Sequence, residues 1–485
     1  MPIRQTPHNI SCMRISLIIC LFLFMGAKVS AQTIEQQKTD SVFQLVKHHF
    51  NNGQVDSLYL LTSDSFRSKI SKNDFDTVMA RQLMPLGEIG QSTLVSFFNN
   101  KIATYKLVFN GFVLQLTMSI DENSKLDYFR FIPFAKPIVP KQIIVATSNP
   151  LKSDIDKKVD TLARQYIQKG NTVGLSIGVY KGGVTSAYNY GETARGNNNL
   201  PASNTIYEIG SITKTFTAAL LAWYVNEGQI KLTDTITKYL PDSVASSPAL
   251  QGITVLTLSN HTSGLPSLPD NFYANSSDTI NPYKDYNKEM MFAYLKNAKL
   301  ASVPGEKYAY SNLGVALLGV ILEKVSGKSY MQMVNDIITK PLQMNSTVLH
   351  VPPQMRTRFV ATYNEAGKPT PPWNWDVFES TGGLRSTVSN MLTYAKANMD
   401  TTGTTALGKA FTLTRQITFT KDVKIGLNWH IIVVNGVEYY FHNGATDGSS
   451  SFLAYNIDRN IAIVILSNCG ERVDAMGTKL LKALE

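Results

Sequence analysis

The sequence predicts a fold of the α/β (α+β) class: an antiparallel sheet flanked by helices with a mostly helical subdomain, preceded by a small α+β domain. Residues 114–120 alternate apolar and polar side chains, which is the period of a β-strand. Strand-like runs stand at 173–190 and again at 427–466, on either side of a long stretch with helical spacing. We therefore expect both ends of the second domain to meet in one antiparallel sheet.

The composition fits a folded protein of more than one domain. The chain has 485 residues, of which 44% are hydrophobic and 17% are charged. This is enough apolar material for a large core, and it excludes disordered, collagen-like and coiled-coil proteins. The net charge is +10, but Lys and Arg are scattered and form no basic stripe interleaved with aromatic residues. Nucleic acid is therefore not expected as a partner.

The N-terminus has the features of a secretory leader. A positive charge precedes the apolar run 15–24, and small residues lead up to Ala31. We expect a signal peptide over 1–31, cut after Ala31, with either Met1 or Met13 as the start. The run is shorter than the roughly 20 residues of a spanning helix, so no stable membrane span is expected after cleavage. Export to the periplasm or out of the cell follows from this interpretation.

Cleavage would remove two of the three cysteines, Cys12 and Cys20. Cys20 follows two isoleucines, whereas a lipoprotein cysteine follows small residues, so lipidation is not favoured. The remaining Cys469 could form no internal disulfide. It follows the apolar run 461–466, and we expect it to be packed rather than reactive.

Residues 32–140 are expected to form the small α+β domain, followed by a linker at 141–150. Its expected elements are helices at 41–50 and 74–83 and strands at 114–120 and 125–134. Asn110-Gly111, between apolar runs, predicts a two-residue hairpin turn. In pattern this unit resembles the small cone-shaped domains that precede some secreted hydrolases. It has no cluster of acids, bases or metal ligands, so we expect a binding or spacer module.

Residues 151–485 are expected to form the larger domain. Its expected elements are strands at 173–180, 184–190, 427–434, 437–442, 450–456 and 461–466, with a closing helix at 471–484. Gly182-Gly183 and Asn435-Gly436 predict tight turns between consecutive strands. The stretch between the two groups of strands, up to about residue 400, is expected to be mostly helical.

The first candidate site element is Ser-Ile-Thr-Lys at 211–214. Apolar residues at helical spacing follow it, so Ser211 lies at or near the first turn of a core helix. Lys214 then lies on the same face, about 5–6 Å away between Cβ atoms. A serine needs a base to become a nucleophile, and a desolvated lysine with a depressed pKa can serve. The other interpretation is a helix N-cap serine with a solvated lysine.

The second element is Tyr310-Ser311-Asn312, which opens an apolar helix over 313–325. A tyrosine near a lysine can pass protons between nucleophile and leaving group, and an asparagine amide can hold both Lys214 and a substrate carbonyl. The bare Tyr-x-Asn pattern also occurs at 224–226 and 273–275, but only Tyr310 follows a turn and precedes a helix.

The third element is His442-Asn443-Gly444, at the end of an expected strand. Gly444 would let a substrate approach the strand backbone, and the amide of Ala445 could pair with that of Ser211 as an oxyanion hole. The other interpretation is a strand-end histidine before a turn.

Together these three elements resemble the serine β-lactamase and penicillin-binding-protein superfamily, especially its class C branch. The strings Glu-Ile-Gly at 208–210, His-Thr-Ser-Gly-Leu at 261–265 and Ser-Thr-Gly-Gly-Leu at 380–384 strengthen the resemblance, which covers about 165–470. It implies a β-lactamase/transpeptidase-like fold.

The resemblance also implies roles for the site residues. Ser211 would be the nucleophile, Lys214 its base and Tyr310 the proton shuttle that later activates water. Asn312 would orient Lys214 and the substrate amide. His442 stands where many relatives carry the lysine of Lys-Thr-Gly. A histidine with a pKa near 6.5 would supply that charge only in part, which disfavours an efficient β-lactamase.

The sequence contains one competing nucleophile motif, and it lacks the common metal and cofactor motifs. Gly-Leu-Ser-Ile-Gly at 174–178 matches the nucleophile elbow of α/β-hydrolases, but that elbow needs a strand, a turn and a helix, whereas Ser176 lies within one expected strand. The sequence contains no His-Glu-x-x-His, phosphate loop or dinucleotide fingerprint, so no metal or other cofactor is expected. The Trp-Asn-Trp at 373–375 could roof a pocket or cover the core.

The sequence therefore predicts an exported serine hydrolase of the peptidase or esterase type, working through a Ser211 acyl-enzyme. Its expected partners are small-molecule or peptide substrates: amides or peptides, including D-amino-acid-containing cell-wall peptide, or esters. Two alternatives stay open. One is a non-catalytic ligand- or peptidoglycan-binding protein that uses the same pocket. The other is a true class C-type β-lactamase.

Overall fold

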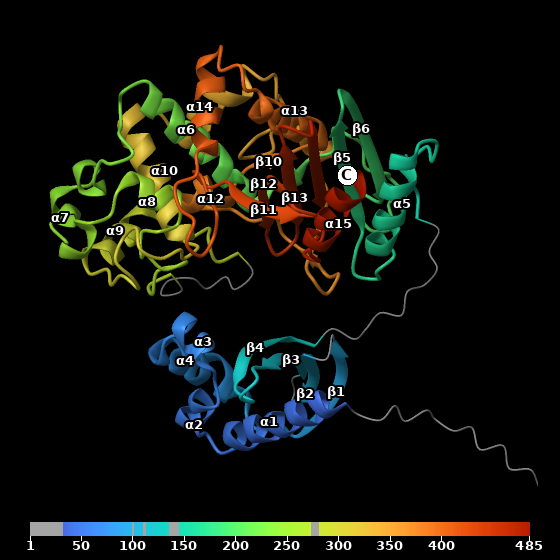
Figure 1. Ribbon diagram of the computed structural model, residues 1–485, viewed down its shortest axis with the longest axis vertical. Helices are drawn as coiled ribbons and strands as arrows, with labels where there is room; N and C mark the ends of the chain where they lie inside the picture. Colours follow the sequence, from blue (N-terminus) through green and yellow to red (C-terminus); the bar gives the residue numbers. More distant parts are fainter. Residues whose placement is uncertain (1–32, 99–100, 110–112, 135–144, 273–280) are drawn as a thin grey trace, which may run out of the picture. The chain divides into compact units, whose positions relative to one another are not determined.

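The computed structural model describes residues 33–98, 101–109, 113–134, 145–272 and 281–485, and it divides the chain into two compact units (Figure 1). The first unit is Met1–Lys136 and the second is Pro137–Glu485. The predicted signal peptide, the turn at Asn110-Gly111 and the Tyr-x-Asn at 273–275 lie outside the described residues, as do residues 141–144 of the predicted linker. No helix in the described ranges is long and apolar enough to cross a membrane.

The first unit consists of helices followed by a four-stranded antiparallel sheet in the order β1-β2-β3-β4. The helices are α1 (Ile34–Asn51), α2 (Val55–Leu60), α3 (Asp64–Lys69) and α4 (Lys72–Val78); the strands are β1 (Gln91–Phe98), β2 (Ile102–Val108), β3 (Val113–Ile120) and β4 (Leu126–Pro133). Val108 pairs with Val113, so β2 and β3 form the hairpin expected there. Phe43 of α1 stacks on Tyr105 of β2 with ring centres 3.8 Å apart, which joins helix and sheet in one core.

The second unit is built on a six-stranded antiparallel sheet in the order β11-β12-β13-β14-β5-β6. Its strands are β5 (Gly174–Lys181), β6 (Val184–Gly191), β11 (His430–Val434), β12 (Val437–Ala445), β13 (Ser450–Asn456) and β14 (Ile461–Ser467). The two ends of this unit therefore meet where β14 pairs with β5, as predicted. Asn435 and Gly436 have φ of 49° and 82°, the left-handed geometry of a two-residue hairpin turn.

Helices cover both faces of this sheet. In β14 alternate residues point to opposite faces, so Ile463 and Ile465 join one core and Val464 and Leu466 join another. Helices α5 (Asp154–Ile167) and α15 (Asp474–Leu484) pack on the first face, and α13 (Val388–Met399) packs on the second (Figure 1). Because both faces are covered, β13 and β14 are buried along their whole length.

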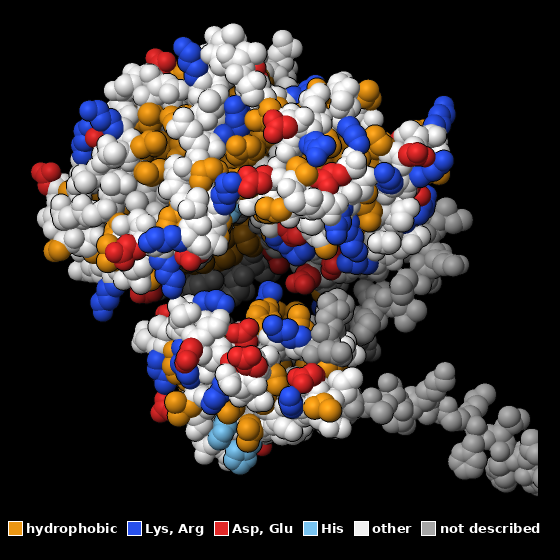
Figure 2. Space-filling view, in the orientation of Figure 1, with side chains coloured by type: hydrophobic (Ala, Val, Ile, Leu, Met, Phe, Trp, Pro, Cys, Tyr) orange, Lys and Arg blue, Asp and Glu red, His pale blue; other side chains and the backbone are white. Residues whose placement is uncertain are grey.

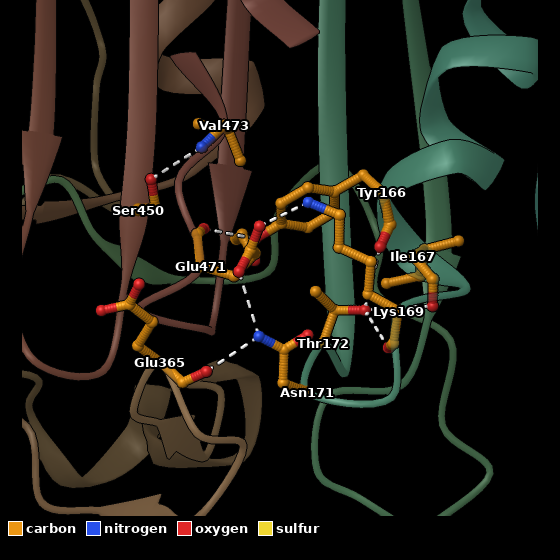
Figure 3. A network of polar contacts seen from close by, with 10 residues as sticks. Tyr166, Ile167, Lys169, Asn171, Thr172, Glu365, Ser450, Glu471 and Val473 are labelled. Carbon is orange, nitrogen blue, oxygen red and sulfur yellow. Dashed lines mark hydrogen bonds and ion pairs between the residues drawn. The ribbon is translucent and has the colours of Figure 1, made fainter. Parts of the chain in front are cut away.

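Polar contacts also join the beginning of the second unit to its end (Figure 3). Tyr166 of α5 donates to the carbonyl of Glu471, before α15, at 2.7 Å. The Glu471 carboxylate accepts from Lys169 and Asn171, and the Asn171 amide also donates to the carbonyl of Glu365. This network fixes the loop after β14 against the loop between α5 and β5.

The remaining elements form the mostly helical subdomain and short two-stranded pairs. They are α6 (Thr213–Asn226), α7 (Asp242–Ala245), α8 (Val255–Ser259), α9 (Lys288–Lys296), α10 (Asn312–Ser326), α11 (Tyr330–Val334), α12 (Glu379–Gly382) and α14 (Ala406–Arg415), with β7 (Tyr207–Glu208), β8 (Thr362–Tyr363), β9 (Pro369–Thr370) and β10 (Arg385–Ser386). Helix α6 is buried on nearly every side, because apolar residues surround it and Thr215 and Thr217 bond to neighbouring backbone and side chains.

Several expected boundaries differ from those observed. β12 continues past His442 to Ala445, because Asn443, Gly444 and Ala445 pair with β13. β11 begins only at His430, since Asn428 has a left-handed φ of 56° that interrupts the strand. Trp375 is buried in the core, where its ring meets Gly382, which favours core cover over a pocket roof for this residue. Cys469 is buried as expected, and burial raises the pKa of its thiol to about 11.

Charged side chains of both signs are interspersed on the face shown in Figure 2. Oppositely charged residues pair locally in several parts of the described chain, as Lys328 does with Asp336 at 2.8 Å.

Candidate active site

Ser211 lies in a tight turn between a short strand and a buried helix. β7 ends at Glu208, a single turn of 3₁₀ helix spans Gly210–Ile212, and α6 begins at Thr213. Gly210 has a left-handed φ of 50°, which lets the chain turn sharply into the helix. Ser211 is partly exposed, whereas its neighbours Gly210 and Ile212 are buried.

Lys214 lies one turn further on, as the spacing predicted. Its Nζ is 3.1 Å from Ser211 Oγ and donates to the carbonyl of Thr381 at 2.8 Å. The side chain is fully buried, and this desolvation holds the pKa of Lys214 well below its usual value of 10.5. A neutral amine has a lone pair, so Lys214 can accept a proton from Ser211.

Tyr310 completes a compact trio with these two residues. It directly precedes α10, whose N-cap Ser311 accepts from Gly314 N at 2.9 Å. Lys214 Nζ lies 5.0 Å from the centre of the Tyr310 ring. Burial raises the pKa of Tyr310, and a hydrogen bond with the Ser211 side chain opposes this rise. Tyr310 is therefore a neutral phenol at pH 7 and can both donate and accept a proton.

Among the described residues Asn312 forms no hydrogen bond with Lys214, and its expected role in orienting Lys214 and the substrate stays a prediction. It is the first residue of α10 and is half-buried. In the described part of the chain, the Lys214 amine bonds instead to the carbonyl of Thr381, from α12. Thr381 belongs to the Ser-Thr-Gly-Gly-Leu string at 380–384, so the string could have drawn attention to it, although a backbone contact leaves no trace in residue type.

The end of β12 approaches the Ser211 turn very closely. A Cβ on Gly444 would lie 2.1 Å from the Ile209 carbonyl oxygen, and one on Gly210 would lie 2.7 Å from Ala445 N. Two glycines therefore bring the turn of Ser211 beside Ala445, the arrangement that a two-amide oxyanion hole requires. The expected approach of a substrate to the strand backbone at Gly444 stays a prediction.

His442 lies within β12 and is almost completely buried, with 1% of its surface exposed. Its Nδ1 donates to the carbonyl of Asn443 at 2.6 Å, which leaves Nε2 as the acceptor of the neutral ring. Burial holds the pKa of His442 well below 6.5, and the nearby His430 and Lys214 lower it further. The expectation of a partly charged histidine at pH 7 is therefore wrong, because it took no account of this burial.

Two further histidines, which the sequence patterns did not indicate as site residues, complete a cluster around Tyr310. The ring of His261 lies 4.4 Å from that of Tyr310, and the ring of His430 lies 5.3 Å from that of His442, between ring centres. His430 Nε2 shares a hydrogen bond of 2.8 Å with the hydroxyl of Tyr308. Burial lowers the pKa of His430 to about 4, so it too is neutral at pH 7. Only the His-Thr-Ser-Gly-Leu string pointed to any of these residues.

Ser176, the competing serine, is buried in the middle of β5. Its hydroxyl donates to Asn189 Oδ1 at 2.8 Å and shares a hydrogen bond of 3.0 Å with Tyr207. A nucleophile elbow would instead expose the hydroxyl on a sharp turn. The described residues also contain no group of three or more His, Cys, Asp or Glu able to hold a metal ion.

Comparison with known proteins agrees with this geometry. The model of the Beta-lactamase family matches residues 159–484, which is most of the second unit. The chain belongs to the Beta-lactamase family. Both the predicted family and the predicted fold class are thereby confirmed, and the match does not extend to the first unit.

Individual curated proteins resemble about half of the chain. It is 33% identical over 248 residues to the D-alanyl-D-alanine-carboxypeptidase/endopeptidase AmpH of Escherichia coli K12, covering 51% of this chain and 62% of that protein. It is 28% identical over 252 residues to a β-lactamase of Pseudomonas fluorescens, covering 51% and 65%. The match thus spans less than two thirds of either relative. A solved class C β-lactamase superimposes with a TM-score of 0.62 at 26% identity, covering 70% of this chain and 98% of that structure.

Proposed function

We propose that the chain is a serine hydrolase that works through an acyl-enzyme on Ser211. The observation that carries the proposal is the buried amine of Lys214, 3.1 Å from a partly exposed serine hydroxyl, with its pKa held well below 10.5 by burial. Its N–H bond to the Thr381 carbonyl fixes the amine and leaves its lone pair for Ser211. Such a pair activates a nucleophile without a charged base.

In the first half-reaction, Ser211 Oγ attacks the substrate carbonyl carbon while its proton passes to Lys214. The carbonyl oxygen gains negative charge, which the amides of Ser211 and Ala445 stabilise. Collapse of this intermediate breaks the bond to the leaving group. Tyr310 passes the proton from Lys214 to that group, and the acyl group remains on Ser211.

In the second half-reaction, water attacks the same carbonyl carbon. Tyr310 accepts a proton from the water while its own hydroxyl proton passes to Lys214. The tetrahedral intermediate collapses, Ser211 Oγ leaves, and the proton returns to it. The products are a carboxylic acid and the free enzyme, and no cofactor takes part. An amine in place of water would give acyl transfer instead.

The electrostatics of the site favour substrates without an obligatory carboxylate. Neutral His442 stands where many relatives place a lysine, and its neighbours His261 and His430 are neutral as well. We therefore propose amide or peptide substrates, including peptides with D-residues such as cell-wall peptide, or esters. The similarity to a D-alanyl-D-alanine-carboxypeptidase/endopeptidase supports the peptide class.

Two other functions use the same pocket. A true class C-type β-lactamase is favoured by the similarity to a class C structure, but lacks support from a charged residue at His442. A non-catalytic binder of ligand or peptidoglycan would have no need of a neutral lysine beside a serine. For the first unit we propose a binding or spacer role. For the protein as a whole we propose export to the periplasm or beyond the cell, through the leader at 1–31.

Intact-protein mass spectrometry after incubation with a fluorophosphonate tests the acyl-enzyme directly. We expect one adduct in wild type and in Ser176→Ala, and none in Ser211→Ala. Labelling of Ser211→Ala, or no labelling of wild type, would contradict the proposal and favour the binder. A penicillin in a parallel incubation separates the substrate classes. A stable adduct indicates a D,D-peptidase-like pocket, and fast turnover of the penicillin indicates a β-lactamase. If there is no adduct and no turnover, the pocket is esterase-like.

A further inference from the structure

We propose that His261 is a positioning residue that holds Tyr310 against Ser211. This inference rests on the proposed function, since it assigns His261 to the proton shuttle of the same site. Two hydrogen bonds carry it. Ala309 N donates to the His261 carbonyl at 2.8 Å, and Ser311 N donates to His261 Nδ1 at 3.2 Å. Tyr310 stands between these two amides, so His261 holds its backbone from both sides.

The His261 ring adds a contact with the Tyr310 side chain. The two ring centres are 4.4 Å apart with the planes inclined by 36°. The loop that begins at His261 extends the same clamp along the chain. Ser311 Oγ donates to the Pro266 carbonyl at 2.7 Å, and Leu313 N donates to the Ser267 carbonyl at 3.1 Å. The start of α10 is thus tied to this loop at successive residues around Tyr310.

The hydrogen bonds define which tautomer of His261 is needed. Because Nδ1 accepts from an amide, it carries no proton, and the neutral ring is protonated at Nε2. The ring is fully buried, and this burial opposes a positive charge on it. Protonation at Nδ1 would place two N–H groups against each other and release Ser311.

The backbone of His261 is held in an unfavourable conformation. Its φ of 60° lies in the left-handed region, which residues other than glycine adopt only at a conformational cost. This conformation lets the carbonyl and the Nδ1 of one residue face two amides of the same segment. The strain is thus tied to the residue that brackets Tyr310.

Two other roles for His261 make different predictions. A proton relay would run through Nε2, but this atom has no hydrogen-bond partner among the described residues. A ring that only fills space would be replaceable by another ring. In the positioning role, the essential feature is an acceptor at the place of Nδ1.

The effect of losing this acceptor is expected on deacylation. With p-nitrophenyl acetate as the substrate, the leaving group needs no proton, so acylation of Ser211 depends little on Tyr310. Hydrolysis of the acetyl-enzyme still needs Tyr310 to activate water. A displacement of about 1 Å can slow such a step about 10²-fold. We therefore expect kcat to fall more than kcat/KM, with acetyl-enzyme accumulating.

Four substitutions of His261 separate the possible roles. His261→Asn keeps an acceptor near the place of Nδ1 and tolerates the left-handed backbone. His261→Gln puts its amide near the place of Nε2, and His261→Phe keeps only a ring. His261→Gly accepts the backbone conformation but offers neither ring nor acceptor. Deacylation is expected to be slowed about 10- to 100-fold in the Gln, Phe and Gly variants and to recover most of the wild-type rate in the Asn variant.

Acetyl-enzyme is quantified by mass spectrometry, and correct folding of each variant by thermal unfolding. If the Gln, Phe and Gly variants deacylate as wild type does, or if only Phe recovers, the positioning role is overturned while acylation of Ser211 still stands. If only the Gln variant recovers the wild-type deacylation rate, a proton relay through Nε2 replaces the positioning role. If wild type never acylates Ser211, the proposed function fails, and ¹⁵N-resolved NMR of the imidazole then tests the inference alone. We expect a neutral His261 ring that is protonated at Nε2. The signal of this ring is assigned by its disappearance from the spectrum of His261→Asn. A ring protonated at Nδ1 would overturn the inference.

Discussion

Gly444 and Ile209 approach so closely that a Cβ on Gly444 would lie 2.1 Å from the Ile209 carbonyl oxygen. This contact holds the end of β12 beside the turn of Ser211. The same carbonyl accepts from Ser451 Oγ of β13 at 2.8 Å, so it cannot retreat without breaking that bond. The position of Ala445 relative to Ser211 therefore depends on the absence of one methyl group.

We predict that Gly444→Ala lowers both stability and acylation of Ser211. The added Cβ must displace backbone rather than a flexible side chain, which typically costs about 1–3 kcal/mol. Urea unfolding and the rate of fluorophosphonate labelling measure the two effects. Gly252→Ala is the matched control, because a Cβ there meets only Pro304 at 3.5 Å, an ordinary contact. Equal stability and equal labelling rates in the two variants would contradict the close approach of Gly444 to Ile209.

Replacing Lys214 tests the neutral base. Lys214→Arg keeps a long basic side chain but stays charged at all accessible pH values, so it cannot accept the proton of Ser211. We expect fluorophosphonate labelling to slow by about 10²–10⁴-fold, the usual contribution of a general base. In wild type the labelling rate should rise with pH around a midpoint below 10.5, since only the deprotonated amine acts as a base. A midpoint at or above 10.5 would show that Lys214 is not desolvated in solution.

Much of this arrangement was predictable from local sequence. The spacing of Ser211 and Lys214 fixes their distance because residues three apart share one face of a helix. Asn435-Gly436 specifies its turn because both residues adopt a left-handed φ with little strain. Alternating apolar residues specify the strands through burial of one or both faces.

Other features depend on contacts that residue type does not encode. The Thr381 carbonyl holds Lys214 through its backbone, and any residue could supply that group. His261 and His430 reach the site only because long-range packing brings the loop of His261 and the start of β11 together near Tyr310. The neutral state of His442 follows from burial, which its place near an expected strand end did not suggest. Sequence patterns therefore predicted the reacting groups better than the backbone and side-chain groups that hold them in place.

A buried ion pair behind the Ser211 turn provides a further test. Arg385 Nη2 lies 3.3 Å from the Glu208 carboxylate, and their side chains are 6% and 2% exposed. Glu208 also accepts a hydrogen bond of 2.8 Å from Oγ1 of Thr446, the residue that follows Ala445. We predict that Arg385→Met lowers the free energy of unfolding by about 3–5 kcal/mol, because it leaves a buried carboxylate without its partner.

The double variant Arg385→Met, Glu208→Gln should recover part of this loss, since it removes the uncompensated charge. Glu438→Gln, in the exposed pair with Lys424, is the control and should change the free energy of unfolding by less than about 1 kcal/mol. Equal losses in the buried and exposed variants would contradict the structure.

The histidine cluster predicts that the second unit loses stability in mild acid. His430 has a pKa of about 4 in the folded protein and near 6.5 when unfolded, and it is enclosed by His261, His442, Lys214 and Tyr308. Below pH 6.5 the unfolded chain therefore binds more protons than the folded one, so the free energy of unfolding falls as the pH falls. For His430 alone the loss between pH 7 and pH 5 is on the order of 2 kcal/mol. His261 and His442 have lowered pKa values too and add to this loss of stability in the same direction.

All four tryptophans lie in the second unit, so tryptophan fluorescence in urea reports on that unit alone. His430→Gln should reduce the difference between pH 7 and pH 5, and an unchanged difference would mean that His430 is not buried as a neutral ring.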